Sequence, residues 1–361
     1  MVFYALFTWL MGAVVLFRWK GRWMGFFLLF LLFFLTAFRG EYIGNDTKTY
    51  LDSHYIFIHA THYANITNLE KFEMTDLGGQ VELLSNLFYK IIFFNGLNER
   101  FILVFFAFIA FYFFYRAINA FKVNLAYGLA IYVILGFMSY SFNINRQMCA
   151  ASVLLYAYSF LQYENKRKCL FFLFVIIASL IHSFSILFVF IYFVKFIPLL
   201  NKKWDVLLFL ICLCLPVVKV NIVNQISTLL DIGHLSNYSL AYGETGLVVN
   251  KVISSYIRIL LLYYFYYKWK KLYVNDNCFF ANFYLLTILF SALLTNYDGI
   301  VGRIALDITV FECIFLSSCF LRKTLKYNSM DMLVLLLMIV FFSYTNFRMI
   351  EPGAPQFYLS F

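Results

Sequence analysis

Long apolar runs separated by short polar breaks are the dominant pattern of this 361-residue chain. The hydrocarbon core of a bilayer is about 30 Å thick, and an α-helix needs about 20 mostly apolar residues to cross it. We therefore expect an all-α, polytopic integral membrane protein whose residues 1–361 form a single transmembrane domain. The runs predict about 12 transmembrane helices, at residues 2–17, 24–38, 101–117, 124–142, 145–163, 169–181, 183–198, 204–222, 250–267, 278–296, 302–320 and 330–347.

The distribution of Lys and Arg gives this helix array an orientation. Most of the 28 basic residues lie in alternate loops, among them 18–22, 166–168 and 268–271, whereas most acidic residues lie in the other loops. Cytoplasmic loops carry the excess of Lys and Arg in membrane proteins. The long polar loops 39–100 and 223–249 are therefore predicted to face outward, as are both termini. The first apolar run is expected to stay in the membrane, because its basic residues follow it.

Residues 81–95 do not fit the pattern of a span. Their apolar positions, among them Leu84, Phe88 and Ile91, recur at helical spacing, but polar residues such as Lys90 interrupt them. This pattern is typical of a helix that lies on a membrane surface. A further span here would invert every later loop and place the basic clusters outside. We therefore predict an interfacial amphipathic helix within the first outward loop.

Composition excludes a soluble domain. The chain is 63% hydrophobic and 13% charged, with a mean hydropathy of +0.81, whereas soluble domains are about 45–50% apolar and about 25% charged. The net charge of +10 would suggest a nucleic-acid partner in a soluble protein. Here the basic residues collect in the predicted cytoplasmic loops, so the charge is mainly an orientation signal. We expect membrane lipid as a partner and no nucleic acid.

Four groups of polar residues stand at the outward ends of the predicted helices. Ionisable residues near membrane depth are costly and mark functional sites by default. Arg146 lies near a predicted helix N-terminus, where its charge opposes the helix dipole, and a bound anion would remove that conflict. We therefore expect an outward-facing site. The groups are Arg39 with 44–47, Asn145 to Gln147, His182, and Arg303 with Asp307.

Each group also has a structural explanation. Arg39 is consistent with a cation that reaches from a helix end to the membrane interface, and Asp46 with a turn or a helix N-cap. His182 is consistent with a buried histidine whose hydrogen bonds are satisfied, and Arg303 with an ion pair to Asp307 one turn later. The residues alone leave these alternatives open.

The chemistry of these groups is limited. The chain has no HExxH, no P-loop and no GxSxG motif, so metallohydrolysis, nucleotide hydrolysis and elbow-type serine catalysis lack support. We predict no metal and no cofactor. Outward-facing arginines with an aspartate and a histidine suit the binding of a pyrophosphate and the deprotonation of a hydroxyl.

At these residues the sequence resembles the EpsG-like group of bacterial polysaccharide polymerases, which includes Wzy-type O-antigen polymerases. The resemblance covers about residues 1–350, although Asn45 and Ser183 depart from the residues that are commoner in the family. The blocks that carry it, in the expected order, are Arg39 with Gly44-Asn45-Asp46-Thr47 and Tyr50, Asn145-Arg146-Gln147 with Ala150-Ala151, 178–183 around His182, and Arg303-Ile304.

The resemblance implies a membrane glycosyltransferase with a GT-C-like architecture in the bacterial inner membrane. Such an enzyme transfers a growing glycan from undecaprenyl pyrophosphate to the incoming lipid-linked repeat unit. The active site then faces the periplasm, and loops 39–100 and 223–249 are periplasmic. Whether a partner protein sets the chain length of the glycan is left open by the sequence. The alternatives are a flippase or transporter for the lipid-linked unit and an O-antigen ligase-type transferase.

The resemblance also suggests roles for individual residues. Arg146 and Arg303 are expected to hold the donor pyrophosphate with help from Arg39. Asp46 or His182 is expected to act as the base for the acceptor hydroxyl, and the sequence does not decide between them. The candidates for binding the acceptor sugar are Tyr50, Asn145 and Gln147.

Overall fold

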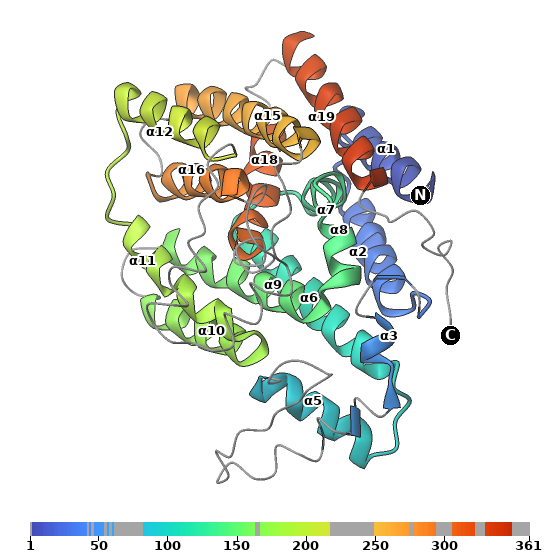
Figure 1. Cartoon of the computed structure of the whole chain (residues 1–361). Coiled ribbons are helices and arrows are strands. Elements are labelled where there is room, and N and C mark those ends of the chain that lie inside the picture. The colour runs from blue at the N-terminus through green and yellow to red at the C-terminus, as the bar shows by residue number, and fades with distance from the viewer. Residues whose placement is uncertain are drawn as a thin grey trace.

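A computed structural model describes residues 2–41, 43–44, 47–53, 56–57, 60, 82–162, 167–216, 249–273, 278–293, 305–321 and 329–348, and all structural statements below refer to these residues. Every regular element among them is a helix (Figure 1). The helices are α1 (Val2–Leu16), α2 (Arg22–Ala37), α3 (Thr47–Tyr50), α5 (Leu83–Phe94), α6 (Phe101–Ala120), α7 (Leu125–Ile134), α8 (Phe137–Asn143), α9 (Asn145–Ser159), η2 (Phe160–Gln162), α10 (Lys168–Ile181), η3 (Ser183–Phe190), α11 (Ile191–Val194), α12 (Lys202–Cys214), α15 (Val249–Tyr273), α16 (Cys278–Leu293), α18 (Glu312–Leu321) and α19 (Ser329–Arg348).

The all-α class predicted from the sequence is confirmed for the described residues, and each segment predicted to span the membrane contains helix. By length and composition, α6 alone among these helices meets the requirements for a span, and α7 and α8 meet them together across a bend of 70°. The other apolar helices are shorter. The number of spans therefore stays a prediction. The predicted loop 223–249 lies, apart from its last residue, outside the described residues.

The bend between α7 and α8 divides a segment that the sequence presents as one apolar run. Gly136 lies between the two helices with φ of 86°, in the left-handed region that glycine adopts without a steric penalty. At its other end, α7 begins at Asn124, whose side chain accepts a hydrogen bond from the backbone N–H of Tyr127. The side-chain amide nitrogen of Asn124 donates to the backbone oxygen of Lys20 over 2.9 Å, and this bond joins two predicted cytoplasmic loops.

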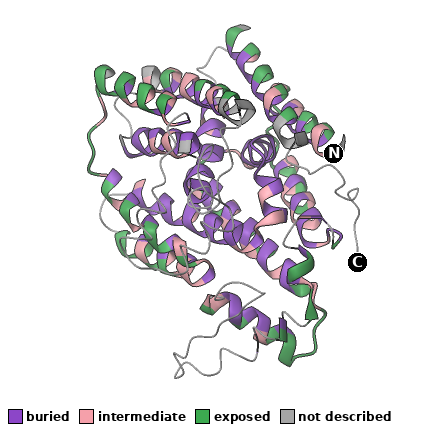
Figure 2. Cartoon of the chain, viewed as in Figure 1, coloured by how far each residue is buried: buried purple, intermediate pink, exposed green. Residues whose placement is uncertain are grey.

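The core of the molecule lies around α7 and α9, where nearly every side chain is buried (Figure 2). Helix α9 packs against α6 and α10, and α7 packs against α1, α2 and α18. Ala150 and Ala151 of α9 are fully buried, and small residues of this kind let membrane helices approach closely. The central position of α9 places its N-terminal residues beside several other helices.

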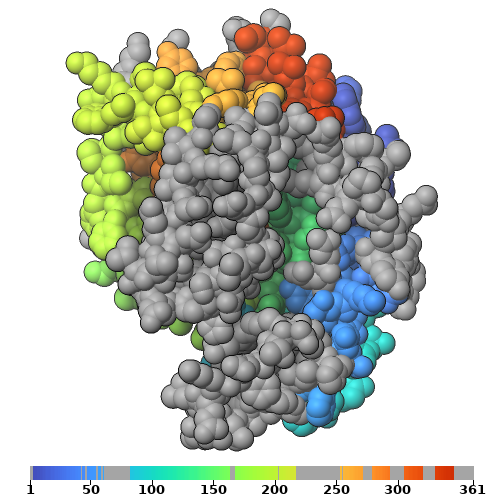
Figure 3. All heavy atoms as spheres, viewed as in Figure 1, coloured from blue at the N-terminus to red at the C-terminus, as the bar shows by residue number. Residues whose placement is uncertain are grey.

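Two ion pairs from α15 hold neighbouring helices in place. Lys268 pairs with Asp331 at the start of α19, and Lys270 pairs with Asp205 at the start of α12. Tyr266 also donates to the Asp205 carboxylate over 3.2 Å. Residues of α12, α15 and α19 line one edge of the face shown in Figure 3. These pairs join residues that flank three loops predicted to be cytoplasmic.

A third ion pair from α15 involves other helices and lies deeper in the molecule. Arg258 of α15 contacts Glu312 of α18 over 2.7 Å, and the Glu312 side chain is fully buried. Ser291 of α16 also donates to Glu312. A buried charge requires such a partner, because an unpaired charge in a low-dielectric interior is strongly destabilising. This pair therefore joins three helices and is explained by packing alone.

The predicted helix near 81–95 is present as α5, and one of its faces is exposed. Leu83, Leu87 and Phe94 recur at helical spacing and are between 47% and 69% exposed. Ser85 and Tyr89 lie on the buried face, which contacts α6 and α10. The helix itself is confirmed, and its position on the membrane surface stays a prediction.

Candidate functional site

The Arg39 side chain is fully buried and bonds to the protein itself. Its Nε donates to Thr47 Oγ1 over 2.8 Å, and its two terminal nitrogens donate to the backbone oxygens of Thr36, over 2.5 Å, and Phe142, over 3.2 Å. Phe142 lies in α8, two residues before Ile144, the N-cap residue of α9. The first block of the family resemblance therefore fixes the chain directly before the second block.

Gly44 makes this approach possible. Its φ is +87°, and a Cβ atom at this position would lie 2.2 Å from the backbone oxygen of Phe142. Only glycine fits both the left-handed backbone and the close contact. The segment that begins at Arg39 can therefore rest against the end of α8 only while position 44 has no side chain.

The N-terminus of α9 presents Arg146. The preceding N-cap residue, Ile144, provides no side-chain hydrogen bond to the first turn. Instead, the Glu82 carboxylate lies beside this end of the helix, with Oε2 3.2 Å from Arg146 Nη1. The Arg146 guanidinium carbon also lies 5.9 Å from the ring centre of Tyr50. A carboxylate is favoured at a helix N-terminus, where it faces the positive end of the dipole.

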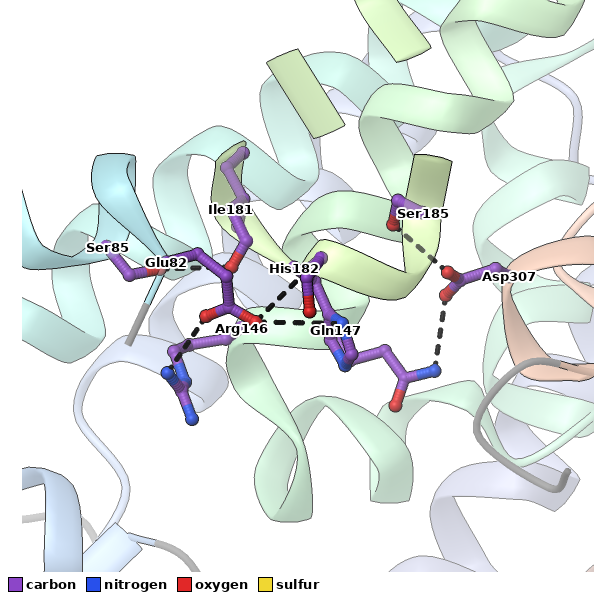
Figure 4. Close-up of polar contacts among 9 residues, drawn as sticks. Glu82, Ser85, Arg146, Gln147, Ile181, His182, Ser185 and Asp307 are labelled. Atoms are coloured by element: carbon purple, nitrogen blue, oxygen red, sulfur yellow. Dashed lines mark hydrogen bonds and ion pairs between the residues drawn. The ribbon is translucent and has the colours of Figure 1, made fainter. Parts of the chain in front are cut away.

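The same carboxylate reaches the break between α10 and η3. His182 at this break has an extended backbone, with φ of −148° and ψ of 112°. Glu82 Oε1 accepts the backbone N–H of Ser183 over 3.1 Å and lies 3.9 Å from His182 Nδ1 (Figure 4). Glu82 therefore connects Arg146 with His182, which are 36 positions apart in the chain.

A second carboxyl group lies behind this cluster. Asp307, in the helical segment 305–309, is fully buried. It accepts hydrogen bonds from Gln147 Nε2 over 3.3 Å and from Ser185 Oγ over 3.2 Å (Figure 4). Both donors are neutral, and the described residues give Asp307 no cationic partner. Because Gln147 follows Arg146 and Ser185 follows His182 closely, the two polar clusters are adjacent.

Asn145, the first residue of α9, is buried with its hydrogen-bonding capacity unused. Only 1% of the residue is exposed, and neither its amide nitrogen nor its amide oxygen has a partner among the described residues. An unsatisfied buried polar group costs about 1–3 kcal/mol. Two unmade bonds next to Arg146 point to a polar ligand at this end of α9.

The structure brings together some of the predicted residues and not others. Arg146 and His182 meet through Glu82, with Tyr50 beside Arg146 and Gln147 on the adjacent Asp307. Arg39 lies apart from them, in contact with the backbone of α8. Asp46 and Arg303 lie outside the described residues, and so does any pairing of Arg303 with Asp307.

Sequence reasoning missed Glu82. It is one of many acidic residues in a polar outward loop, and its only local signal is its place directly before the amphipathic segment. Asp307 had a stronger signal, because an acid within an apolar run is unusual. No group of three or more His, Cys, Asp or Glu side chains in the described part of the chain could hold a metal ion.

Comparison with known proteins identifies the family. A family model, that of the EpsG family, matches residues 22–358, which is nearly the whole chain. No curated protein and no solved structure matches the chain. EpsG proteins are membrane proteins, and the family indicates a role in polysaccharide polymerisation. The family expected from the short sequence blocks is confirmed, and the GT-C-like architecture stays a prediction.

Proposed function

This chain belongs to the EpsG family, and on that premise we propose that it polymerises oligosaccharide repeat units linked to undecaprenyl pyrophosphate. The growing glycan leaves its lipid pyrophosphate carrier and joins a hydroxyl of the incoming repeat unit. The reaction takes place at the periplasmic face of the bacterial inner membrane. Both substrates are lipids in that membrane, so no nucleotide sugar is required.

The arrangement around Arg146 is the observation that carries this proposal. A guanidinium at the N-terminus of α9, with no side-chain cap on the first turn, lies close to a histidine and to an unsatisfied buried amide. Guanidinium groups and helix N-termini both favour phosphate. An amide with a free donor and a free acceptor suits a sugar hydroxyl. Donor, base and acceptor contacts are thus available at one end of α9.

The proposed reaction has a simple balance of bonds. The acceptor hydroxyl oxygen attacks the anomeric carbon of the donor glycan while a base takes its proton. The bond between that carbon and the pyrophosphate oxygen breaks, and the pyrophosphate leaves with the electron pair. Arg146 stabilises the negative charge that develops on the leaving group, as positioned cations do in phosphate chemistry. No oxidant or reductant is needed.

The other predicted residues take supporting places in this proposal. Arg303 shares the pyrophosphate with Arg146, and Asp46 remains the alternative base to His182. Arg39 acts indirectly, because its guanidinium binds the backbone of α8 and so fixes the start of α9. The residues proposed to bind the acceptor sugar are Tyr50, Asn145 and Gln147.

Arg146→Ala tests the proposal in membranes of the producing bacterium. We expect elongation to fall by about 100-fold or more, since loss of one group that stabilises developing charge has effects of that size. Lipid-linked single repeat units should accumulate in place of long chains, as resolved by gel electrophoresis of the glycan. The matched control is Arg116→Ala. Arg116 lies near the C-terminal end of α6, on the predicted cytoplasmic side, and among the described residues it bonds only to tyrosine hydroxyls.

Other outcomes would contradict the proposal. Wild-type chain lengths in Arg146→Ala at normal expression would remove Arg146 from the reaction. Purified protein that moves the lipid-linked unit across vesicles without elongating it would be a transporter. Transfer of the glycan to lipid A core instead of to another repeat unit would make the protein a ligase.

A further inference from the structure

Glu82 is the centre of the contacts that join Arg146 with His182. We propose that Glu82 is a positioning residue that orients His182 as the base for the acceptor hydroxyl and holds Arg146 beside the donor. This inference rests on the proposed polymerase function and decides between the two candidate bases in favour of His182.

Three contacts fix the Glu82 carboxylate. Oε2 pairs with Arg146 Nη1 at 3.2 Å, and Oε1 accepts the N–H of Ser183 at 3.1 Å. The remaining contact is with His182 Nδ1, at 3.9 Å. The Glu82 and His182 side chains are only 15% and 13% exposed, so water screens their interaction weakly.

The position of Glu82 on its helix makes this arrangement rigid. Glu82 is the N-cap residue of α5, and one turn later Ser85 Oγ donates to the backbone oxygen of Ile181 over 3.1 Å (Figure 4). Ile181 is the last residue of α10, directly before His182. The start of α5 is therefore attached to the same break in the chain that carries the histidine.

A carboxylate beside Nδ1 has a specific effect on a histidine base. When Nδ1–H faces the carboxylate, the lone pair is on Nε2, which can take the proton of the acceptor hydroxyl. The resulting imidazolium is then stabilised by the carboxylate. The 3.9 Å separation is longer than a hydrogen bond, and catalytic contacts of this kind often shorten only when substrate binds.

The other charged groups near His182 do not replace Glu82. Among the described residues, the elements packed around the break carry few charges besides Glu82. Arg146 is a cation, so it opposes the imidazolium and makes the carboxylate between them more important. The remaining charged residues are Lys90 on α5, Arg167 and Lys168 at the opposite end of α10, and Asp307, which is bonded to Gln147 and Ser185.

The test is the pH dependence of elongation by the purified protein in lipid nanodiscs. The substrate is the lipid-linked repeat unit isolated from the producing bacterium after deletion of this gene. Glu82→Gln keeps the shape of the side chain and removes its charge, and Glu82→Asp keeps the charge. The matched control is Glu99→Gln, which removes a carboxylate from the same outward loop and has no ion pair among the described residues.

We expect Glu82→Gln to lower kcat at neutral pH by about 10–100-fold, which is part of the factor of about 10²–10⁴ that a positioned general base contributes. Its activity should also extend to lower pH than that of the wild type. The reason is that the inactive imidazolium loses the carboxylate that stabilises it, so that the ring becomes neutral at a lower pH. Glu82→Asp should keep the acid limb of the wild-type profile, and Glu99→Gln should keep both rate and profile.

A change in KM alone with the wild-type acid limb in Glu82→Gln would overturn the inference. If Glu82→Gln does not fold, as judged by gel filtration, His182→Gln decides the question. If the residual activity of His182→Gln still falls at low pH as in the wild type, the inference is overturned. If that fall at low pH is absent, the inference is supported. A wild-type protein that does not elongate would instead defeat the proposed function itself.

Discussion

Asn145 carries a cost for the free protein that a bound polar ligand would offset. Its amide is buried with both polar atoms unpartnered among the described residues, although buried amides in folded proteins are nearly always hydrogen-bonded. Asn282 of α16 is a useful comparison, because its amide oxygen also has no partner among the described residues, but its amide nitrogen donates to the backbone oxygens of Ile197 and Pro198. Two buried asparagines therefore have different expected effects on stability.

We predict that Asn145→Leu leaves the thermal unfolding temperature unchanged or raises it. The apolar side chain of similar volume removes a desolvation cost of about 1–3 kcal/mol per unsatisfied group. Elongation should fall by at least about 10-fold, which corresponds to about 1.4 kcal/mol of lost substrate contact. Asn282→Leu should lower the unfolding temperature, because it breaks two hydrogen bonds. If Asn145→Leu were as destabilising as Asn282→Leu and still elongated normally, its role would be structural.

The residues of the site differ in how far the sequence could predict them. Arg146 and His182 were found because an ionisable residue at the edge of an apolar run is costly. Glu82 lies 64 positions before Arg146, in a polar loop where acidic residues are ordinary. Only the fold brings α5 across the ends of α9 and α10. An ionisable residue beside an apolar run, where its charge is energetically costly, is therefore a better guide to a site than an acidic or basic residue in a polar loop.

At the scale of elements, Arg39, Gly44 and Thr47 together support the start of α9. The backbone oxygen of Phe142 accepts a hydrogen bond from Arg39 and also lies 3.3 Å from Thr47 Oγ1. Gly44 lies against the same oxygen. A motif that could be assigned to substrate on its composition thus holds one helix end in the described structure.

Gly44→Ala should disturb this support. A left-handed backbone costs an alanine about 1–2 kcal/mol, and the added Cβ would lie 2.2 Å from the Phe142 oxygen. We predict a lower unfolding temperature and weaker elongation, measured on the purified protein. Gly96→Ala is the matched control, because Gly96 also has a positive φ, +59°, but no atom within 4 Å of its added Cβ. Equal losses of stability in the two variants would show that the contact with Phe142 adds nothing.

The elements themselves were largely predictable, and so were the breaks marked by polar residues, such as the one at His182, but the break between α7 and α8 was not. Apolar runs of sufficient length indicate helices, and α9 and α10 lie where such runs stand. The apolar run at 124–142 gives no sign that α7 ends within it, because apolar residues continue on both sides of the 70° bend at Gly136. A break of this kind depends on backbone dihedral angles, which hydrophobicity does not record.

At the scale of the whole molecule, contacts between distant loops agree with the orientation expected from charge. Lys268 and Lys270 reach Asp331 and Asp205, beside loops predicted to be cytoplasmic. In contrast, the contacts of Glu82 join segments predicted to lie outside. Each set connects loops of one predicted side only. The packing of the chain therefore agrees with the positive-inside pattern on which loops share a side, and the charge pattern alone predicts which of the two sides is cytoplasmic.

This topology predicts which positions an impermeant thiol reagent can reach. In a variant whose seven cysteines are replaced by serine or alanine, Asn98→Cys tests the outward loop and Lys203→Cys tests the first turn of α12 on the predicted cytoplasmic side, since both residues are exposed. A charged maleimide should label the first variant in intact spheroplasts and the second only after the membrane is permeabilised. The reverse result would place the Arg146 site in the cytoplasm, where a lipid-linked repeat unit has not yet crossed the membrane. Polymerisation at the periplasmic face requires the expected result, because the outward loop carries Glu82 to that site.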